Sequence, residues 1–182
     1  MPEEEAVQPA ELQKYINQYL PEDIAVTSVA IAGERFHSRL NATGKTYEYH
    51  LIPYGTYDVF ARKYAWQMTA LLDITAMREA AGYVLGSHDF RSFCTKAAKK
   101  KSTVRTIRLL EIFETKNEIV IEITGNGFLY NMVRILVGTL VEVGMGMRKP
   151  DEIPAILEKK ERRYAGETAP ACGLFLKQIY YE

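Results

Sequence analysis

The sequence has 182 residues, of which 47% are hydrophobic and 25% are charged, and its formal net charge at pH 7 is zero. This length suits one domain or two small ones, and the composition excludes a disordered or fibrous chain. No apolar run approaches the roughly eighteen residues of a membrane-spanning helix, so we expect no membrane partner. The acidic start of the chain and the isolated cysteines, Cys94 and Cys172, predict a reducing, cytoplasmic location.

Hydrophobic periodicity and terminal residues predict the helices and strands. In chain order they are a helix over residues 9–20, strands over 24–32 and 46–53, a helix over 73–85, strands over 104–113 and 118–124, helices over 128–143 and 151–161, and a strand over 174–181. Because these elements follow no regular β-α-β order, we expect an α+β fold. Its sheet should be mixed or largely antiparallel and flanked by helices.

Positive charge is concentrated in the middle of this neutral chain. Residues 90–110 contain no acidic side chain, and their basic side chains are Arg91, Lys96, Lys99, Lys100, Lys101, Arg105 and Arg108. Such a segment could bind a polyanion, which the overall charge would not reveal. The charge alone favours the alternative, a solvated basic loop.

The predicted helix over residues 128–141 contains one charged residue, Arg134. The helix is apolar nearly all round and should therefore be buried. No acidic residue lies three or four positions away on either side of Arg134. A buried guanidinium without an anion costs several kcal/mol, so Arg134 needs a distant carboxylate, a phosphate or a route to solvent. An arginine that extends outward along its aliphatic stem is the structural alternative.

Residues 36–47 combine aromatic, imidazole and basic side chains just before a predicted strand. This mixture can stack on bases and contact phosphates, although an irregular polar loop has the same composition. His37, His50 and His88 show no metal-ligand spacing with one another or with the cysteines, so we expect no metal site.

Four segments in order resemble one family. Residues 36–49 are similar to its motif F-H-A-R…A-T-x-R-x-Y-x-Y, and 86–93 to G-x-H-D-F-x-S-F. Residues 127–138 are similar to F-x-x-x-M-V-R-x-x-V-G, and 169–176 to A-P-x-x-G-L-x-L. Together they cover most of the chain and resemble the bacterial tRNA pseudouridine synthase A (TruA) family, which implies the pseudouridine synthase fold.

One part of the family pattern is missing. The nucleophilic aspartate of the family lies in an R-T-D-A-G-x-H motif, and none of the aspartates of this sequence follows Arg-Thr: Asp23, Asp58, Asp73, Asp89 and Asp151. Asp89 belongs to the H-D-F segment, which does not supply the nucleophile. We therefore expect residues 1–182 to be one domain, the C-terminal portion of such an enzyme, inactive by itself. Residues 1–30 would be a connecting helix and strand from a missing N-terminal part.

The resemblance implies roles for individual residues. Arg134 matches the arginine that pairs with the catalytic aspartate and orients it. Tyr47 matches the tyrosine whose ring stacks on the flipped uracil and whose hydroxyl could move a proton, and Leu174 is expected to contact the substrate. The expected RNA contacts are His37, Arg39, Lys45, Lys99, Lys100, Lys101 and Arg105.

The implied reaction converts uridine to pseudouridine in the anticodon stem-loop of tRNA. The N-glycosidic bond breaks, the base turns and a carbon–carbon bond forms, on a nucleotide that must first leave the stack. The resemblance implies a cytoplasmic homodimer with tRNA as its partner and with no metal or organic cofactor. The alternatives are a non-catalytic RNA-binding module or a dimerisation domain derived from the same scaffold.

Overall fold

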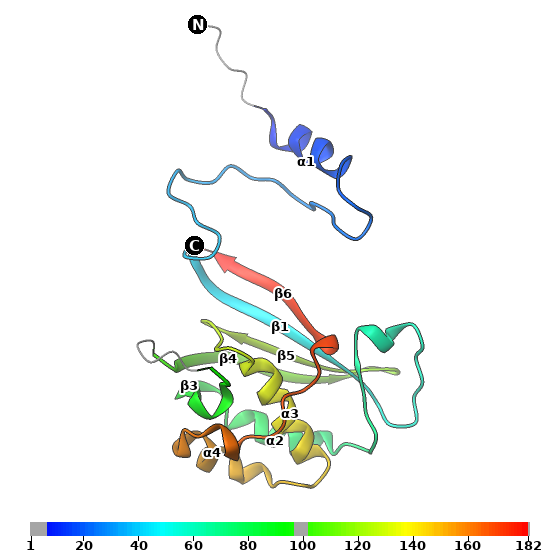
Figure 1. The fold of residues 1–182 in the computed structure, drawn as a ribbon, viewed down its shortest axis with the longest axis vertical. Helices are drawn as coiled ribbons and strands as arrows, with labels where there is room; N and C mark the ends of the chain where they lie inside the picture. The colour runs from blue at the N-terminus through cyan, green and yellow to red at the C-terminus, as the bar shows by residue number, and fades with distance from the viewer. Residues whose placement is uncertain (1–6, 97–101, 182) are drawn as a thin grey trace, which may run out of the picture. The chain divides into compact units, whose positions relative to one another are not determined.

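The computed structural model of the chain describes residues 7–96 and 102–181 (Figure 1). The chain divides into two compact units, Met1–Asn41 and Ala42–Glu182. Whether residues 1–182 act as one domain, with 1–30 as a connecting segment, remains a prediction. The run Lys99 to Lys101 lies outside the described residues.

The first unit contains helix α1 (Pro9–Asn17) followed by extended backbone. The strand predicted over residues 24–32 is wrong. In the described part of the unit these residues pair with no strand, and the backbone of Val26 bonds to the side chain of Asn17 instead. Its N–H donates to Asn17 Oδ1 at 2.8 Å, and its carbonyl accepts from Asn17 Nδ2 at 2.9 Å. β-Branched residues favour a strand only where neighbouring strands pack against them.

A single sheet organises the described residues of the second unit. Its strands follow the order β2-β1-β5-β4-β3, and β6 also pairs with β1. The bounds are β1 (Ala42–Ile52), β2 (Trp66–Gln67), β3 (Gly86–Asp89), β4 (Val104–Glu114), β5 (Ile119–Gly125) and β6 (Leu174–Tyr181). Among these, the pairing of β1 with β2 is parallel and the others are antiparallel. The expected α+β class with a largely antiparallel sheet is confirmed.

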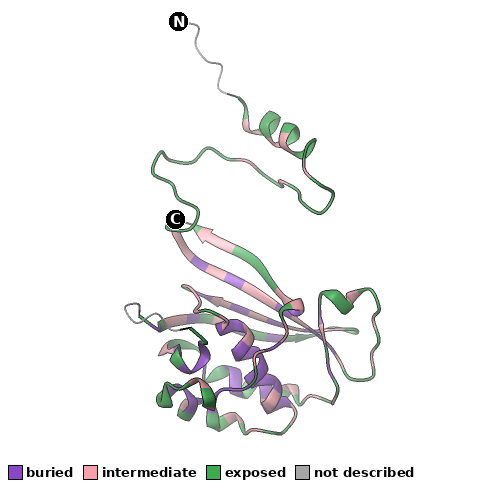
Figure 2. Ribbon diagram, viewed as in Figure 1, coloured by how far each residue is buried: buried purple, intermediate pink, exposed green. Residues whose placement is uncertain are grey.

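The helices of this unit gather on one face of the sheet (Figure 1). They are α2 (Ile74–Gly82), α3 (Met132–Gly144) and α4 (Ile153–Lys159). Short 3₁₀ turns lie in the connections between the elements of this unit: η1 (Ala61–Lys63), η2 (Phe90–Phe93), η3 (Pro150–Glu152), η4 (Arg162–Tyr164) and η5 (Ala171–Gly173). Figure 2 shows that α3 is buried along most of its length, as its apolar sequence predicts. Ile119, Ile121 and Ile123 of β5 belong to the same core.

Two predicted helix boundaries are wrong, because a residue with positive φ stands at the start of one helix and at the end of the other. The helix expected over 128–143 begins at Met132, because Asn131 has φ 60° and ψ 8°, the left-handed conformation. The helix expected over 151–161 is a 3₁₀ turn followed by α4, which ends at Lys159 because the next residue, Lys160, has φ 52°. A left-handed residue interrupts a right-handed helix. The sequence also missed the short strands β2 and β3, which are too brief for a visible alternation.

No helix in the described ranges 7–96 and 102–181 combines the length and the apolar character that crossing a membrane requires.

Candidate active site

A pocket of about 100 Å³ lies between β1 and the beginning of α3. Three residues singled out from the sequence line it, and they come from three separate elements. Tyr47 is in β1, Arg134 is in the first turn of α3 and Leu174 is the first residue of β6. The rest of the lining consists of Phe128, Leu129, Asn131, Met132 and Val133. Strand pairing brings two of the three together, because β6 lies beside β1.

Tyr47 is half-buried at the edge of this pocket. Its ring packs edge-on against Phe128, with the centroids 5.2 Å apart and the planes at 90°. Burial raises the pKa of the Tyr47 hydroxyl above the ordinary value of tyrosine. The hydroxyl therefore remains protonated near neutral pH and can donate a hydrogen bond or a proton to a molecule in the pocket.

Arg134 is half-buried rather than fully buried, which corrects the expectation from its apolar helix. Its Nε donates to the carbonyl of Ala169 at 2.7 Å, and its Nη1 lies 3.4 Å from Oδ1 of Asn131. Within the described residues no carboxylate is paired with it. Because a guanidinium carries five N–H donors, several remain for an anionic partner.

Asn131 is a pocket residue that the sequence reasoning missed. Its left-handed backbone at φ 60° turns the chain sharply between Phe128 and α3. Outside glycine, asparagine is one of the residues most often found in this conformation, so the Asn131 type was the available signal. Residues held in strained conformations cluster at functional sites.

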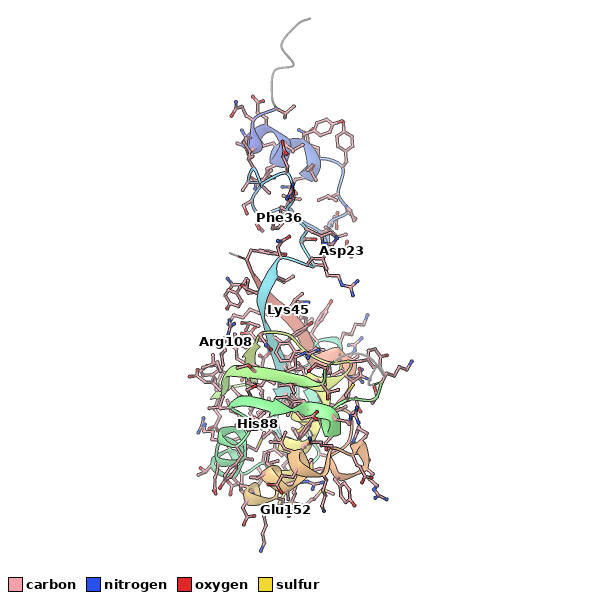
Figure 3. All side chains as sticks on the ribbon, turned by 90° about the vertical axis from the view of Figure 1, so that its left-hand side faces the viewer. Asp23, Phe36, Lys45, His88, Arg108 and Glu152 are labelled. Atoms are coloured by element: carbon pink, nitrogen blue, oxygen red, sulfur yellow. The ribbon has the colours of Figure 1, made fainter. Side chains whose placement is uncertain are left out.

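Basic side chains lie at the end of the sheet nearest the pocket. Lys45 in β1 is opposite Gly125 of β5, and Ile107 of β4 is opposite the same glycine. Arg105 Nε approaches the loop at Gly127, which leads directly into Phe128. Lys45 and Arg108 are both labelled in Figure 3. Nη2 of Arg108 lies 3.4 Å from the carbonyl oxygen of Thr43, two residues before Lys45 in β1.

Two other expected RNA contacts lie in the first part of the chain. His37 and Arg39 belong to the first compact unit. There, Nδ1 of His37 accepts from the backbone N–H of Arg39 at 3.2 Å.

Asp89 does not line the pocket, and its carboxylate is held by neighbouring donors. Its Oδ1 accepts from the Thr103 hydroxyl at 2.5 Å and from the Arg91 N–H at 3.1 Å, and its Oδ2 lies 3.3 Å from Lys160 Nζ. Partial burial acts to raise the pKa of this carboxyl, but these donors outweigh burial and lower the pKa below its ordinary value. The carboxylate is a structural acceptor at the end of β3.

The α+β fold is the one expected for a pseudouridine synthase, and comparison with known sequences gives the same class. Residues 80–182 match the family described as tRNA pseudouridine synthase. The chain therefore belongs to the tRNA pseudouridine synthase family, a family of isomerases.

Individual relatives are similar over almost the whole chain. The tRNA pseudouridine synthase A 1 of Bacillus cereus is 47% identical over 166 residues, which cover 91% of this chain and 67% of that protein. The tRNA pseudouridine synthase A of Bacillus subtilis (strain 168) is 46% identical over 175 residues, covering 96% of this chain and 71% of that protein. The resemblance inferred from the four motifs is confirmed.

Proposed function

We propose that these 182 residues form the C-terminal portion of an enzyme that isomerises uridine to pseudouridine in the anticodon stem-loop of tRNA, and that they are inactive by themselves. The observation that carries the proposal is the meeting of Tyr47, Arg134 and Leu174 around one pocket at the basic end of the sheet. Family membership supports the reaction, and the names of the relatives support tRNA as the substrate.

Three of the residues that line the pocket, Tyr47, Leu174 and Arg134, have a chemical role in this proposal. The flipped uracil stacks on the ring of Tyr47 and packs against Leu174. The C1′–N1 bond of uridine breaks, the base rotates and C5 bonds to C1′. C5 then loses its hydrogen as a proton and N1 gains a proton, so the product is an isomer of uridine. The raised pKa keeps the Tyr47 hydroxyl protonated, so it can donate a proton to the base. Arg134 orients the carboxylate that opens the glycosidic bond.

That carboxylate is not among the residues that line the pocket. We propose that it comes from an Arg-Thr-Asp segment outside these 182 residues and pairs with the remaining donors of Arg134. A charge-assisted pair of this kind is strong in a partly buried site, because water competes weakly there.

The basic end of the sheet provides the attraction for tRNA. Lys45 is two positions before Tyr47 in β1, and Arg105 Nε approaches the loop at Gly127. Lys99, Lys100 and Lys101 precede β4 in the sequence. We assign these residues, with His37 and Arg39, to contacts with the RNA backbone and its exposed bases. Contacts of this kind position a nucleic acid without reading its sequence.

Tritium release from tRNA labelled at C5 of uracil tests the function, because tritium leaves when the C5–C1′ bond forms. The 182-residue protein alone should release none. A chimaera in which a segment with the family's R-T-D-A-G-x-H motif precedes residue 1 should release it. Release by the 182-residue protein alone would show that one of its own residues supplies the nucleophile. A chimaera that binds tRNA without release would favour the alternative, a non-catalytic RNA-binding module.

A further inference from the structure

Arg134 and Ala169 exchange two hydrogen bonds. Arg134 Nε donates to the carbonyl of Ala169 at 2.7 Å, and the N–H of Ala169 donates to the carbonyl of Arg134 at 3.1 Å. Ala169 belongs to residues 165–170, an extended segment that we call the strap. The direction of the guanidinium therefore depends on where the strap lies against α3.

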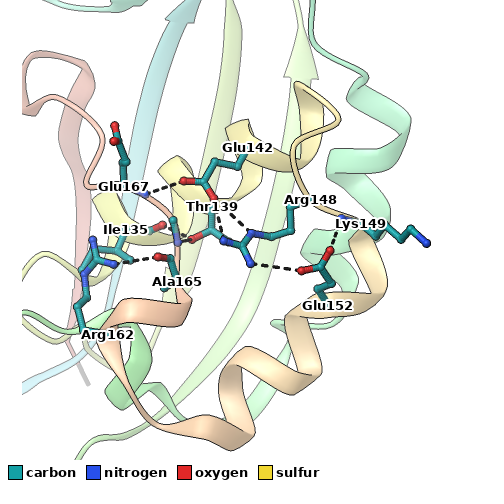
Figure 4. A network of polar contacts seen from close by, with 10 residues as sticks. Ile135, Thr139, Glu142, Arg148, Lys149, Glu152, Arg162, Ala165 and Glu167 are labelled. Carbon is teal, nitrogen blue, oxygen red and sulfur yellow. Dashed lines mark hydrogen bonds and ion pairs between the residues drawn. The ribbon is translucent and has the colours of Figure 1, made fainter.

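Two side chains of α3 hold the beginning of the strap (Figure 4). The buried Thr139 hydroxyl accepts from the N–H of Gly166 at 2.9 Å and donates to the carbonyl of Ile135 at 2.7 Å. Glu142 Oε1 accepts from the N–H of Glu167 at 2.9 Å. The other oxygen of Glu142 is 2.9 Å from Nη2 of Arg148, which fixes the carboxylate in place.

A residue of β1 holds the end of the strap. The Tyr49 hydroxyl donates to the carbonyl of Pro170 at 2.6 Å, one residue after the carbonyl that Arg134 uses. The Tyr49 ring is fully buried, and burial raises the pKa of its hydroxyl, so the hydroxyl remains a donor. Tyr49 is two positions from Tyr47 in the same strand. The strand that presents Tyr47 to the pocket thus also anchors the strap.

We propose that the strap positions Arg134 for the isomerisation, with Thr139, Glu142 and Tyr49 as positioning residues that act through it. This inference rests on the proposed function. Arginine has a long, flexible side chain, and a bond at Nε restricts rotation of the guanidinium while leaving Nη donors for an anion. A site held in this way keeps its geometry because supporting residues lock the reacting side chain.

Hydrogen exchange at Nε–H of Arg134, measured by NMR on the 182-residue protein, tests the positioning without any catalysis. Tyr49→Phe and Thr139→Val each remove a bond to the strap. Each should speed this exchange by about tenfold, the factor that corresponds to the loss of one net hydrogen bond. Thr139→Ser keeps the hydroxyl and should restore the parental rate.

Ser92→Ala is the matched control. Ser92 is buried, and its hydroxyl donates to the carbonyl of Ile156 at 2.6 Å, so this variant also loses a buried hydrogen bond outside the strap. Its Arg134 exchange should remain at the parental rate. If Thr139→Val does not fold, Tyr49→Phe decides alone, since it keeps the buried ring.

Two results would overturn the positioning role. One is exchange in Tyr49→Phe and Thr139→Val no faster than in Ser92→Ala, and the other is equal acceleration in all three variants. Failure of the proposed function gives a different pattern, in which the chimaera releases no tritium while the exchange rates still follow the strap.

Discussion

Tyr47 lines the pocket, and its aromatic ring and its hydroxyl have different roles in the proposed reaction. Its ring is held by Phe128, and its pKa is raised by burial. Leu174 and Arg134 line the same pocket from β6 and α3, and Tyr47 is the residue of β1 in the lining. The hydroxyl and the ring have separable roles.

Tyr47→Phe keeps the ring and removes the hydroxyl. In the chimaera we expect tRNA affinity to be unchanged and the single-turnover rate of tritium release to fall by about a hundredfold or more, the usual effect of losing a positioned proton-transfer group. Tyr180→Phe is the control, because that hydroxyl bonds to Thr46 at 3.0 Å and does not line the pocket. Equal rates in parent and Tyr47→Phe would remove the hydroxyl from the mechanism.

Asp89 should make stability depend on pH. The pKa of Asp89 is lower in the folded protein than in the unfolded chain, so the ionised carboxylate stabilises the fold. This stabilisation is complete above the pKa of the unfolded chain and is lost as the pH falls through the pKa of the folded protein. Asp89→Asn should lower the free energy of unfolding by about 1 kcal/mol at pH 7, the net worth of one hydrogen bond. The difference from the parent should shrink below about pH 4, the ordinary range of aspartate. Urea unfolding of the parent and of Asp89→Asn across pH measures this difference.

At the scale of elements, α3 and the strap pack backbone to backbone. A Cβ added at Gly138 would overlap the carbonyl oxygen of Glu167 and press on its carbon at 2.9 Å. The close approach places Ala169 within bonding distance of Arg134. Gly138 therefore serves the site although it is not part of the pocket.

Gly138→Ala should force α3 and the strap apart. We expect a loss of about 1–3 kcal/mol in the free energy of unfolding, as for other overpacked cores. Gly82→Ala is the contrasting control, because nothing lies within 4 Å of its Cβ position at the end of α2. It should gain up to about 1 kcal/mol from helix propensity. Similar urea midpoints for the two variants would contradict the packing argument.

The basic segment before β4, Lys99 to Lys101, is proposed to contact the tRNA backbone. The triple variant Lys99/Lys100/Lys101→Ala should weaken tRNA binding at low salt and reduce the slope of log affinity against log salt by about 2, because fewer counterions are released. The comparison uses the chimaera across a salt series, with Tyr47→Phe as the variant expected to keep the parental slope. Binding by the triple variant with parental affinity and slope would leave the segment as a solvated loop.

At the scale of the whole molecule, assembly is a further proposal. The family resemblance supports a cytoplasmic homodimer whose RNA-binding surface is shared between subunits. Light scattering on the purified protein should then report twice the 20.7 kDa chain mass. A mass of one chain at micromolar concentration would contradict dimerisation by this part of the enzyme.

Local patterns in the sequence were sufficient for much of the fold. Hydrophobic patterns located β1, β4, β5 and β6. In β5 buried residues alternate with partly exposed ones, because one face of that strand meets the core. A helix was expected from residue 73, and Asp73 is the N-cap of α2, where its carboxylate accepts from the N–H of Ala76 at 2.9 Å. The expected strand over 24–32 failed, because pairing depends on a partner that no local pattern specifies.

The sequence by itself determined the α+β class, the apolar helix around Arg134 and, through four motifs, the family. These follow from residue types at short spacings, which local physical chemistry constrains. Only the tertiary structure decided that Tyr47, Arg134 and Leu174 share a pocket, and that a carbonyl of Ala169 holds the guanidinium. Arg134 and Ala169 are far apart in sequence, and their contact depends on how the chain returns across α3. Hydrophobic burial favours packing of the strap on α3 but is non-directional, so it does not select one alignment of the two. Contacts of the strap with Gly138, Thr139 and Tyr49 select that alignment.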